Sequence, residues 1–215
     1  EDIMGSQYSI YDYHVSSSLG GDAALAKLRE NLNQFGISLI LDFAGNHLSI
    51  DNPITLTDPD IFIRYKGETP NKNEFFKTSN GDWLAHGRDP HYPPWTDTVQ
   101  INHFNLKARK YLLDTLLQVS SMCDGLRCDM VMLMLNKVFR DTWGKYIQEE
   151  SPADEFWPEA IAKVKEQYPF FTFAAEVYWG LEWEVQELGF DYTYDKTLYD
   201  RLLLSNPQDI QGHLN

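Results

Sequence analysis

Three acidic side chains stand near the ends of three short apolar runs. They are Asp42 in LILDFAGNH, Asp129 in GLRCDM and Glu176 in FAAEVYW. Each run has the length of a strand, and parallel α/β folds build their active sites at the carboxyl edge of the sheet. Any one of these acids could be an ordinary loop or cap carboxylate. Because all three would reach one edge from successive strands, we expect them to meet in a site.

GLRCDM places an arginine two residues before an aspartate. Alternate residues of a strand face the same side, so Arg127 and Asp129 should share a pocket while Cys128 packs on the other side. The guanidinium should lower the pKa of Asp129 and keep it ionised, as a nucleophile requires. The apolar neighbours of Glu176 suit a protonated general acid, and such a pair performs glycoside hydrolysis. A purely structural ion pair between Arg127 and Asp129 is the alternative.

Strand and helix patterns alternate along the chain. Helical spacing covers 21–35, 105–122, 151–168, 182–188 and 195–204, and strand-like runs cover 37–43, 125–132, 170–177 and 190–194. This order predicts an α/β fold with a parallel sheet, either open or part of a (β/α)8 TIM barrel. About four strands cannot close an eight-stranded barrel. Residues 44–104 hold most of the prolines and show little periodicity, which indicates a functional loop or a small subdomain.

Capping signals locate two of the helix starts. Asn105 is a suitable N-cap for the helix at 105–122. The segment SPADEF predicts a start at Ser151, with Pro152 at the first helical position and Asp154 in the first turn.

Composition excludes some classes of function. The formal net charge is −14, which argues against nucleic acid as a partner, because such binding depends on Lys and Arg neutralising phosphates. No apolar stretch reaches 18 residues, so we expect no membrane span. Cys123 and Cys128 lie too far apart along an extended segment for a disulfide, so both should be buried thiols. Neither a metal-binding histidine motif such as HExxH nor a Gly-rich phosphate loop is found.

Taken in order, LDFAGNH, GLRCDM and FAAEVYW resemble three sequence regions of the α-amylase family of glycoside hydrolases. GSQYSIYDY, WTDTVQINHFN and LGFDYTYDKTLYDRL resemble further segments of that family, so the likeness covers nearly the whole chain. The resemblance implies an incomplete (β/α)8 barrel, about strands three to six, from residues 1–47 and 105–215. Residues 48–104 would form an inserted subdomain after strand three.

The resemblance also implies roles for particular residues. Asp129 would be the nucleophile, Glu176 the general acid and base, and Arg127 the residue that orients Asp129. His47 would bind a sugar hydroxyl and Tyr8 would stack on the sugar ring. Trp179 follows the acid closely and is the other aromatic residue that we expect against sugar. Asp42 and Asn46 would hold their loop in place.

The chain departs from the family pattern at several positions. Met132 and Leu133 stand where a Lys and a His often bind sugar. Gln100 and Asn102 replace an acidic pair that often supplies a calcium ligand, so we expect no cofactor; calcium is possible but unsupported by these residues. The third catalytic acid of the family is expected beyond Asn215, so residues 1–215 alone should be inactive.

The implied function is retaining hydrolysis of α-glucosidic bonds in starch-like or malto-oligosaccharide substrates, with an α-glucan as the partner. Two alternatives remain open. One is a transglycosylase (glucanotransferase) on the same scaffold. The other is a non-catalytic carbohydrate-binding relative, although both visible catalytic acids are present.

Overall fold

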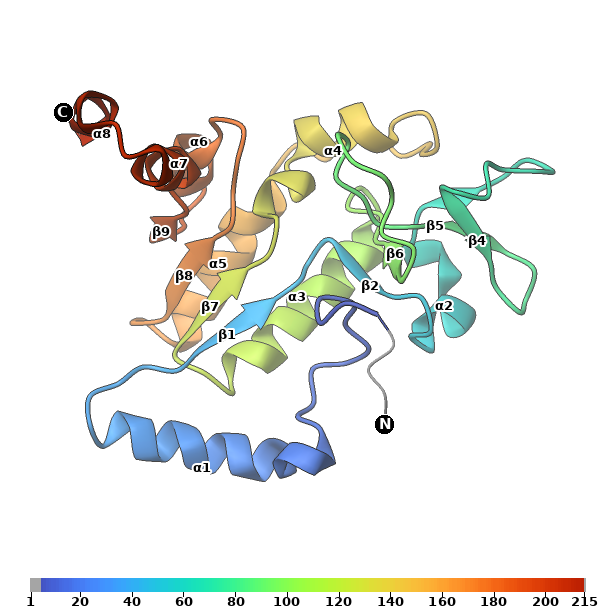
Figure 1. The fold of residues 1–215 in the computed structure, drawn as a ribbon. Helices are drawn as coiled ribbons and strands as arrows, with labels where there is room; N and C mark the ends of the chain where they lie inside the picture. The colour runs from blue at the N-terminus through green and yellow to red at the C-terminus, as the bar shows by residue number, and fades with distance from the viewer. Residues whose placement is uncertain (1–4, 215) are drawn as a thin grey trace.

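A four-stranded parallel sheet forms the centre of the computed structural model, which describes residues 5–214. Its strands lie in chain order, β1-β7-β8-β9, and every neighbouring pair is parallel. Their bounds are β1 Ile40–Phe43, β7 Gly125–Cys128, β8 Thr172–Ala175 and β9 Tyr192–Thr193. Sequential parallel strands require crossovers, and helices supply them here (Figure 1). The predicted α/β class with a parallel sheet is therefore confirmed.

Two helices cover one face of this sheet (Figure 1). They are α3 (Leu106–Ser120) and α5 (Phe156–Gln167), which also pack against each other. Each buries a stripe of five residues, and Leu116 and Trp157 are among the fully buried side chains. At about 25 cal/mol per Å² of buried apolar surface, such stripes are what hold the helices on the sheet. The two helices thus fix one face of the sheet.

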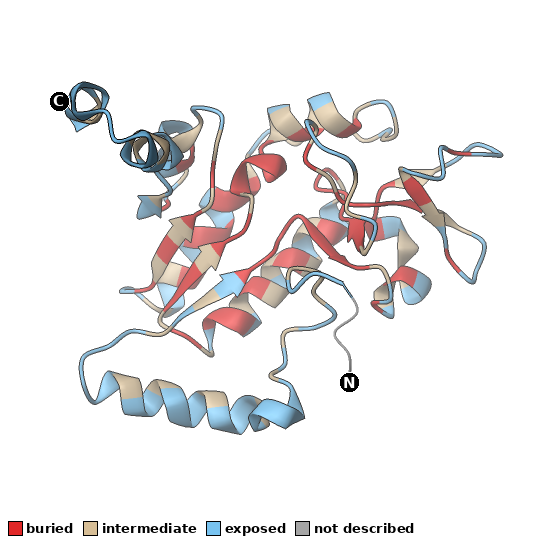
Figure 2. Ribbon diagram, viewed as in Figure 1, coloured by how far each residue is buried: buried red, intermediate tan, exposed pale blue. Residues whose placement is uncertain are grey.

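The outer helices are packed differently. Helices α1 (Gly21–Asn33), α7 (Lys196–Leu204) and α8 (Pro207–Leu214) contain no buried residue in the described part of the chain. Figure 2 shows them as exposed or intermediate along their whole length, in contrast to the buried centre. None of the helices between residues 5 and 214 has the length and hydropathy that a membrane crossing needs.

Residues 44–104 contain two small antiparallel sheets. One pairs β2 (His47–Ser49) with β6 (Thr98–Gln100), and the other has the order β3-β5-β4, from Arg64–Tyr65, Trp83–Ala85 and Phe75–Lys77. The remaining short helices are α2 (Ile54–Thr57), α4 (Asn136–Trp143) and α6 (Glu182–Glu187). Residues 48–104 as a separate subdomain remain a prediction, and β2 crosses its first boundary.

One predicted helix start is wrong. Helix α5 begins at Phe156, five residues after Ser151, and Glu155 occupies its N-cap position. The carbonyls of Pro152 and Asp154 instead accept hydrogen bonds from the amide of Asn136, at 3.1 and 3.2 Å. These long-range contacts hold 151–155 as a loop and override the local capping signal. By contrast, Asn105 caps α3 as expected, accepting from the N–H groups of residues 107 and 108.

Candidate active site

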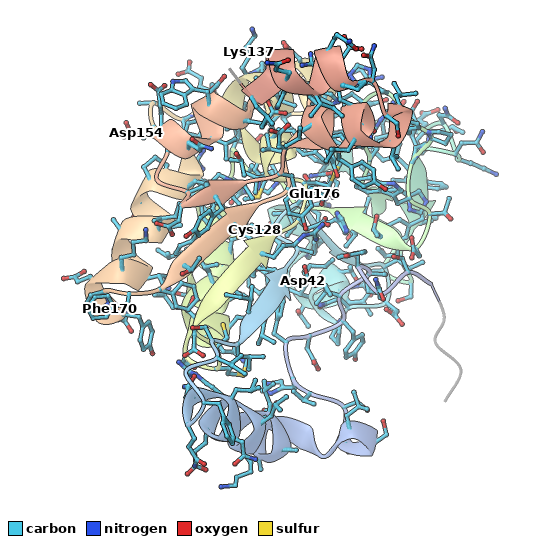
Figure 3. The ribbon with its side chains drawn as sticks, turned by 60° about the vertical axis from the view of Figure 1, so that its left-hand side comes forward. Asp42, Cys128, Lys137, Asp154, Phe170 and Glu176 are labelled. Atoms are coloured by element: carbon cyan, nitrogen blue, oxygen red, sulfur yellow. The ribbon has the colours of Figure 1, made fainter. Side chains whose placement is uncertain are left out.

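The three acids do reach one edge of the sheet. Asp42 lies near the end of β1, whereas Asp129 and Glu176 directly follow β7 and β8. Figure 3 shows Asp42 and Glu176 toward this carboxyl edge and Phe170 at the opposite end of the sheet. Asp42 is in register with Arg127 on the neighbouring strand, which brings their side chains together. Parallel register therefore assembles the cluster.

Arg127 is the centre of this cluster. Its Nη1 donates to Asp129 Oδ1 at 3.0 Å and to Asp42 Oδ1 at 3.1 Å, and its Nη2 donates to Glu176 Oε2 at 2.7 Å. Its Nε donates to the hydroxyl of Tyr194 at 3.0 Å. Burial alone would lower the pKa of Arg127, but Tyr194 and the carboxylates of Glu176 and Asp129 raise it above its usual value. The guanidinium is therefore a permanent cation that holds both candidate catalytic acids.

Cys128 lies between Arg127 and Asp129 in the sequence but is not part of their hydrogen-bonded cluster. It is fully buried in the core, and it and Cys123 are both free thiols, as the sequence predicted. The strand pleat thus separates a packing residue from the two charged residues that flank it.

The prediction that Arg127 lowers the pKa of Asp129 and keeps it ionised is wrong. Its side chain is 8% exposed, and burial together with the nearby Glu176 carboxylate raises its pKa to about 7. The Arg127 guanidinium opposes this shift but does not cancel it. One cation faces two buried acids, so burial and the neighbouring carboxylate favour the protonated form of Asp129.

A cavity of about 290 Å³ opens beside this cluster. Ten residues line it: Ser6, Tyr8, His47, Trp95, Asp97, Thr98, Arg127, Asp129, Met130 and Glu176. The predicted substrate-binding residues Tyr8 and His47 therefore lie in the same pocket as the predicted catalytic residues. Burial lowers the pKa of His47 to about 4, so its imidazole is neutral at physiological pH. Its ring packs against Trp95 with 5.1 Å between ring centroids.

Trp179 is not among the residues that line this cavity. It is 41% exposed and makes an edge contact with His91, with 5.1 Å between centroids. It does not share the cavity lining with Tyr8 and His47, so its contact with sugar stays a prediction.

The structure adds three aromatic residues to this site. The sequence indicates Trp95 and Tyr178 as candidate sugar platforms but favours ordinary packing for both, and it does not single out Tyr194. Trp95 lines the cavity, Tyr194 bonds to Arg127, and the Tyr178 hydroxyl donates to Glu176 Oε1 at 2.5 Å. Tyr178 stands two residues after the acid, the spacing that puts both on one face of an extended segment. That spacing was the available signal for Tyr178. Trp95 and Tyr194 come from distant segments, and no local pattern places them at this site.

The possible calcium site is filled by side-chain amides. Gln100 Nε2 donates to both the backbone oxygen and Oδ1 of Asn46, each at 3.0 Å, and both side chains are buried. Calcium takes six to eight oxygen ligands, mostly carboxylate and carbonyl. Across residues 5–214, no three His, Cys, Asp or Glu side chains are grouped so as to hold a metal. The residues present do not fit calcium, because an amide donor points at the oxygens that a cation would need.

The fold of this chain is shared with α-amylases. Among solved structures of such enzymes, an α-amylase from Lactobacillus plantarum matches 94% of this chain with a TM-score of 0.64 and 24% identity. An α-amylase from H. orenii matches 93% with a TM-score of 0.66 and 19% identity. The chain spans 43% of the length of each.

A curated relative gives the sequence likeness. Over 135 residues, 62% of this chain, it is 25% identical to the α-amylase MalA of Haloarcula japonica, and it spans 19% of that protein. No protein-family model matches the chain. The resemblance to the α-amylase family that the three motifs indicated is confirmed by these comparisons.

Proposed function

We propose that this chain supplies the middle of a (β/α)8 catalytic domain, about strands three to six, with residues 48–104 inserted over the site. The sequential parallel order β1-β7-β8-β9 supports this, because neighbouring strands of such a barrel follow one another along the chain. The match to 43% of an α-amylase chain is also of the size that half a barrel would give.

The whole protein, on this proposal, hydrolyses α-glucosidic bonds of starch-like or malto-oligosaccharide substrates with retention. The observation that carries it is the position of Asp129 and Glu176 on one guanidinium, inside a cavity that also contains Tyr8 and His47. Retaining glycosidases place their two carboxyl groups roughly 5–5.5 Å apart. Two acids held by adjacent nitrogens of Arg127 are compatible with that spacing.

In the first step Glu176 protonates the glycosidic oxygen while an Asp129 oxygen attacks the anomeric carbon, which gives a glycosyl ester and releases the leaving sugar. In the second step Glu176 removes a proton from water, whose oxygen displaces Asp129 from the same carbon. Two inversions give net retention. The reaction needs one proton on the pair at the start, the state that the raised pKa of Asp129 favours. Substrate binding must leave that proton on Glu176.

Two pocket residues would orient the sugar. His47 Nε2 lies 3.2 Å from the Tyr8 carbonyl and Nδ1 lies 3.4 Å from Asn46 Nδ2, so a sugar hydroxyl would replace one of these partners. Because the imidazole is neutral, this exchange would not place a second cation beside Arg127. The Tyr8 ring lies 5.4 Å from the Arg127 guanidinium carbon, which occupies one face of the ring. The opposite face is the one that would stack on the sugar.

Proton NMR of the products tests this proposal. We expect the full-length protein to cleave maltoheptaose and to release the α-anomer first, before mutarotation. First release of the β-anomer would overturn the retaining mechanism, and absence of cleavage would overturn the activity. Products longer than maltoheptaose would instead indicate the glucanotransferase.

A further inference from the structure

The two oxygens of Glu176 have different partners. Oε2 accepts from Arg127 Nη2 at 2.7 Å and from the backbone N–H of Met130 at 3.2 Å. Oε1 accepts from the hydroxyl of Tyr178 at 2.5 Å. Met130 can point its N–H at Glu176 because its backbone turns through the left-handed region, with φ of 45°. The positions of these donors are thus fixed by the ends of β7 and β8.

A carboxylate oxygen offers about two acceptor sites. Both sites on Oε2 are taken by donors that cannot give way, a guanidinium and a backbone amide, whereas Oε1 accepts from the Tyr178 hydroxyl. A proton carried by Glu176 is therefore favoured on Oε1 over Oε2. There it meets the Tyr178 hydroxyl, which can rotate and serve as donor or acceptor.

We propose that Tyr178 is a positioning residue that tunes Glu176 as an acid, by donating a hydrogen bond to Oε1 once that oxygen has given up its proton. This inference rests on the proposed function. As the proton moves from Oε1 to the glycosidic oxygen, the O–H bond of Glu176 breaks and negative charge stays on the carboxylate. The Tyr178 hydroxyl then donates to that charge, which stabilises the carboxylate as it forms.

Other charged groups face the same carboxylate. Arg127 reaches it from β7, and Asp129 follows the same strand. Tyr194, after β9, and Asp42, on β1, reach it only through Arg127. Burial and the hydrogen bond to Glu176 raise the pKa of Tyr178 itself, so its hydroxyl keeps its proton and remains a donor. Of these groups, Tyr178 donates to Oε1, and the carboxyl group of Asp129 also lies within hydrogen-bonding reach of Glu176.

The Tyr178→Phe variant of the full-length protein tests this role by leaving-group dependence. We expect kcat/KM for maltoheptaose, whose leaving sugar needs a proton, to fall about ten- to hundredfold. For dinitrophenyl α-maltoside, whose leaving group departs without one, kcat/KM should change less than threefold, roughly the scatter of a neutral substitution. Tyr192→Phe, at an exposed tyrosine on β9, is the matched control and should leave both substrates unchanged.

Carbon-13 NMR of the carboxyl groups gives a readout that does not depend on turnover. Loss of the donor should make the Asp129–Glu176 pair keep its proton to higher pH in Tyr178→Phe. A 3,5-difluorotyrosine at position 178 is a stronger donor of nearly the same shape and should shift the titration to lower pH. This substitution tests the same role if the Phe variant does not fold.

The two proposals fail in different ways. Equal losses on both glycosides, or a titration that neither change moves, would overturn the role of Tyr178. A native protein that cleaves neither glycoside would overturn the proposed function, while the titration would still decide whether Tyr178 tunes the pair.

Discussion

Helices α3 and α7 have similar amphipathic sequences but opposite surroundings. Helix α3 buries five residues against the sheet, whereas α7 buries none and exposes Leu202, Leu203 and Leu204. The same difference separates the inner strands β7 and β8 from the outer elements. Arg127, Asp129 and Glu176 all belong to the inner part. Within residues 5–214 the candidate site is therefore held by the most completely packed elements.

The largest expected effect is on catalysis by the inner acids. Asp129→Asn in the full-length protein should lower kcat on maltoheptaose by on the order of 10⁴-fold or more, because the amide cannot attack the anomeric carbon. Asp200→Asn makes the same chemical change on α7, where Asp200 is half exposed and pairs with Lys196. The control should retain full activity. Steady-state kinetics measures both, and an active Asp129→Asn variant would contradict the nucleophile assignment.

The next expected effect is on stability, and it compares a buried leucine of α3 with an exposed leucine of α7. Leu116→Ala in α3 removes a fully buried side chain and should lower the free energy of unfolding by about 2–5 kcal/mol. Leu203→Ala in α7 removes one that is 65% exposed and should change it by about 0.5 kcal/mol or less. Urea unfolding measures both values. Equal losses would show that α7 packs against a partner as tightly as α3 does.

The sequence predicted the strands of the inner region and their acidic residues, but not the protonation of Asp129 or the start of α5. Local alternation was enough to find the strands and the positions of Asp129 and Glu176 at their ends. The protonation of Asp129 was not predictable from Arg127 beside it, because the Glu176 carboxylate from another strand and burial decide it. The start of α5 was missed for a similar reason, since Asn136 binds the carbonyls before that helix. Contacts between distant segments override local signals in both places.

A smaller effect concerns the buried amide pair. Gln100→Ala should lower the free energy of unfolding by about 1–3 kcal/mol, because it removes the buried hydrogen bonds between Gln100 and Asn46. Gln118→Ala, at an exposed position on α3, should cost about 0.5 kcal/mol or less. We also expect a calcium chelator such as EGTA to leave the Tm of the native protein unchanged, since Gln100 already donates to the oxygens of Asn46. A lower Tm in EGTA would contradict this interpretation.

The last effect is a pH dependence of stability that arises at the site itself. The pKa of Asp129 rises from an ordinary value of 3.8 to about 7 on folding. Between these values the folded chain holds a proton that the unfolded chain has released, so the free energy of unfolding falls as pH increases. This contribution is complete below about pH 4 and is lost as pH rises through about 7.

Asp129→Asn removes this dependence because the amide does not titrate. The gain in stability of Asp129→Asn over the native protein should therefore be larger at pH 8 than at pH 5, as measured by urea unfolding. Asp200→Asn should show no such gain, because its carboxylate is half exposed. A gain that does not grow with pH would mean that Arg127 keeps Asp129 ionised after all. If the gain increases with pH, the buried ionised Asp129 lowers the stability of the native protein. The half-exposed Asp200 on α7 has no such effect.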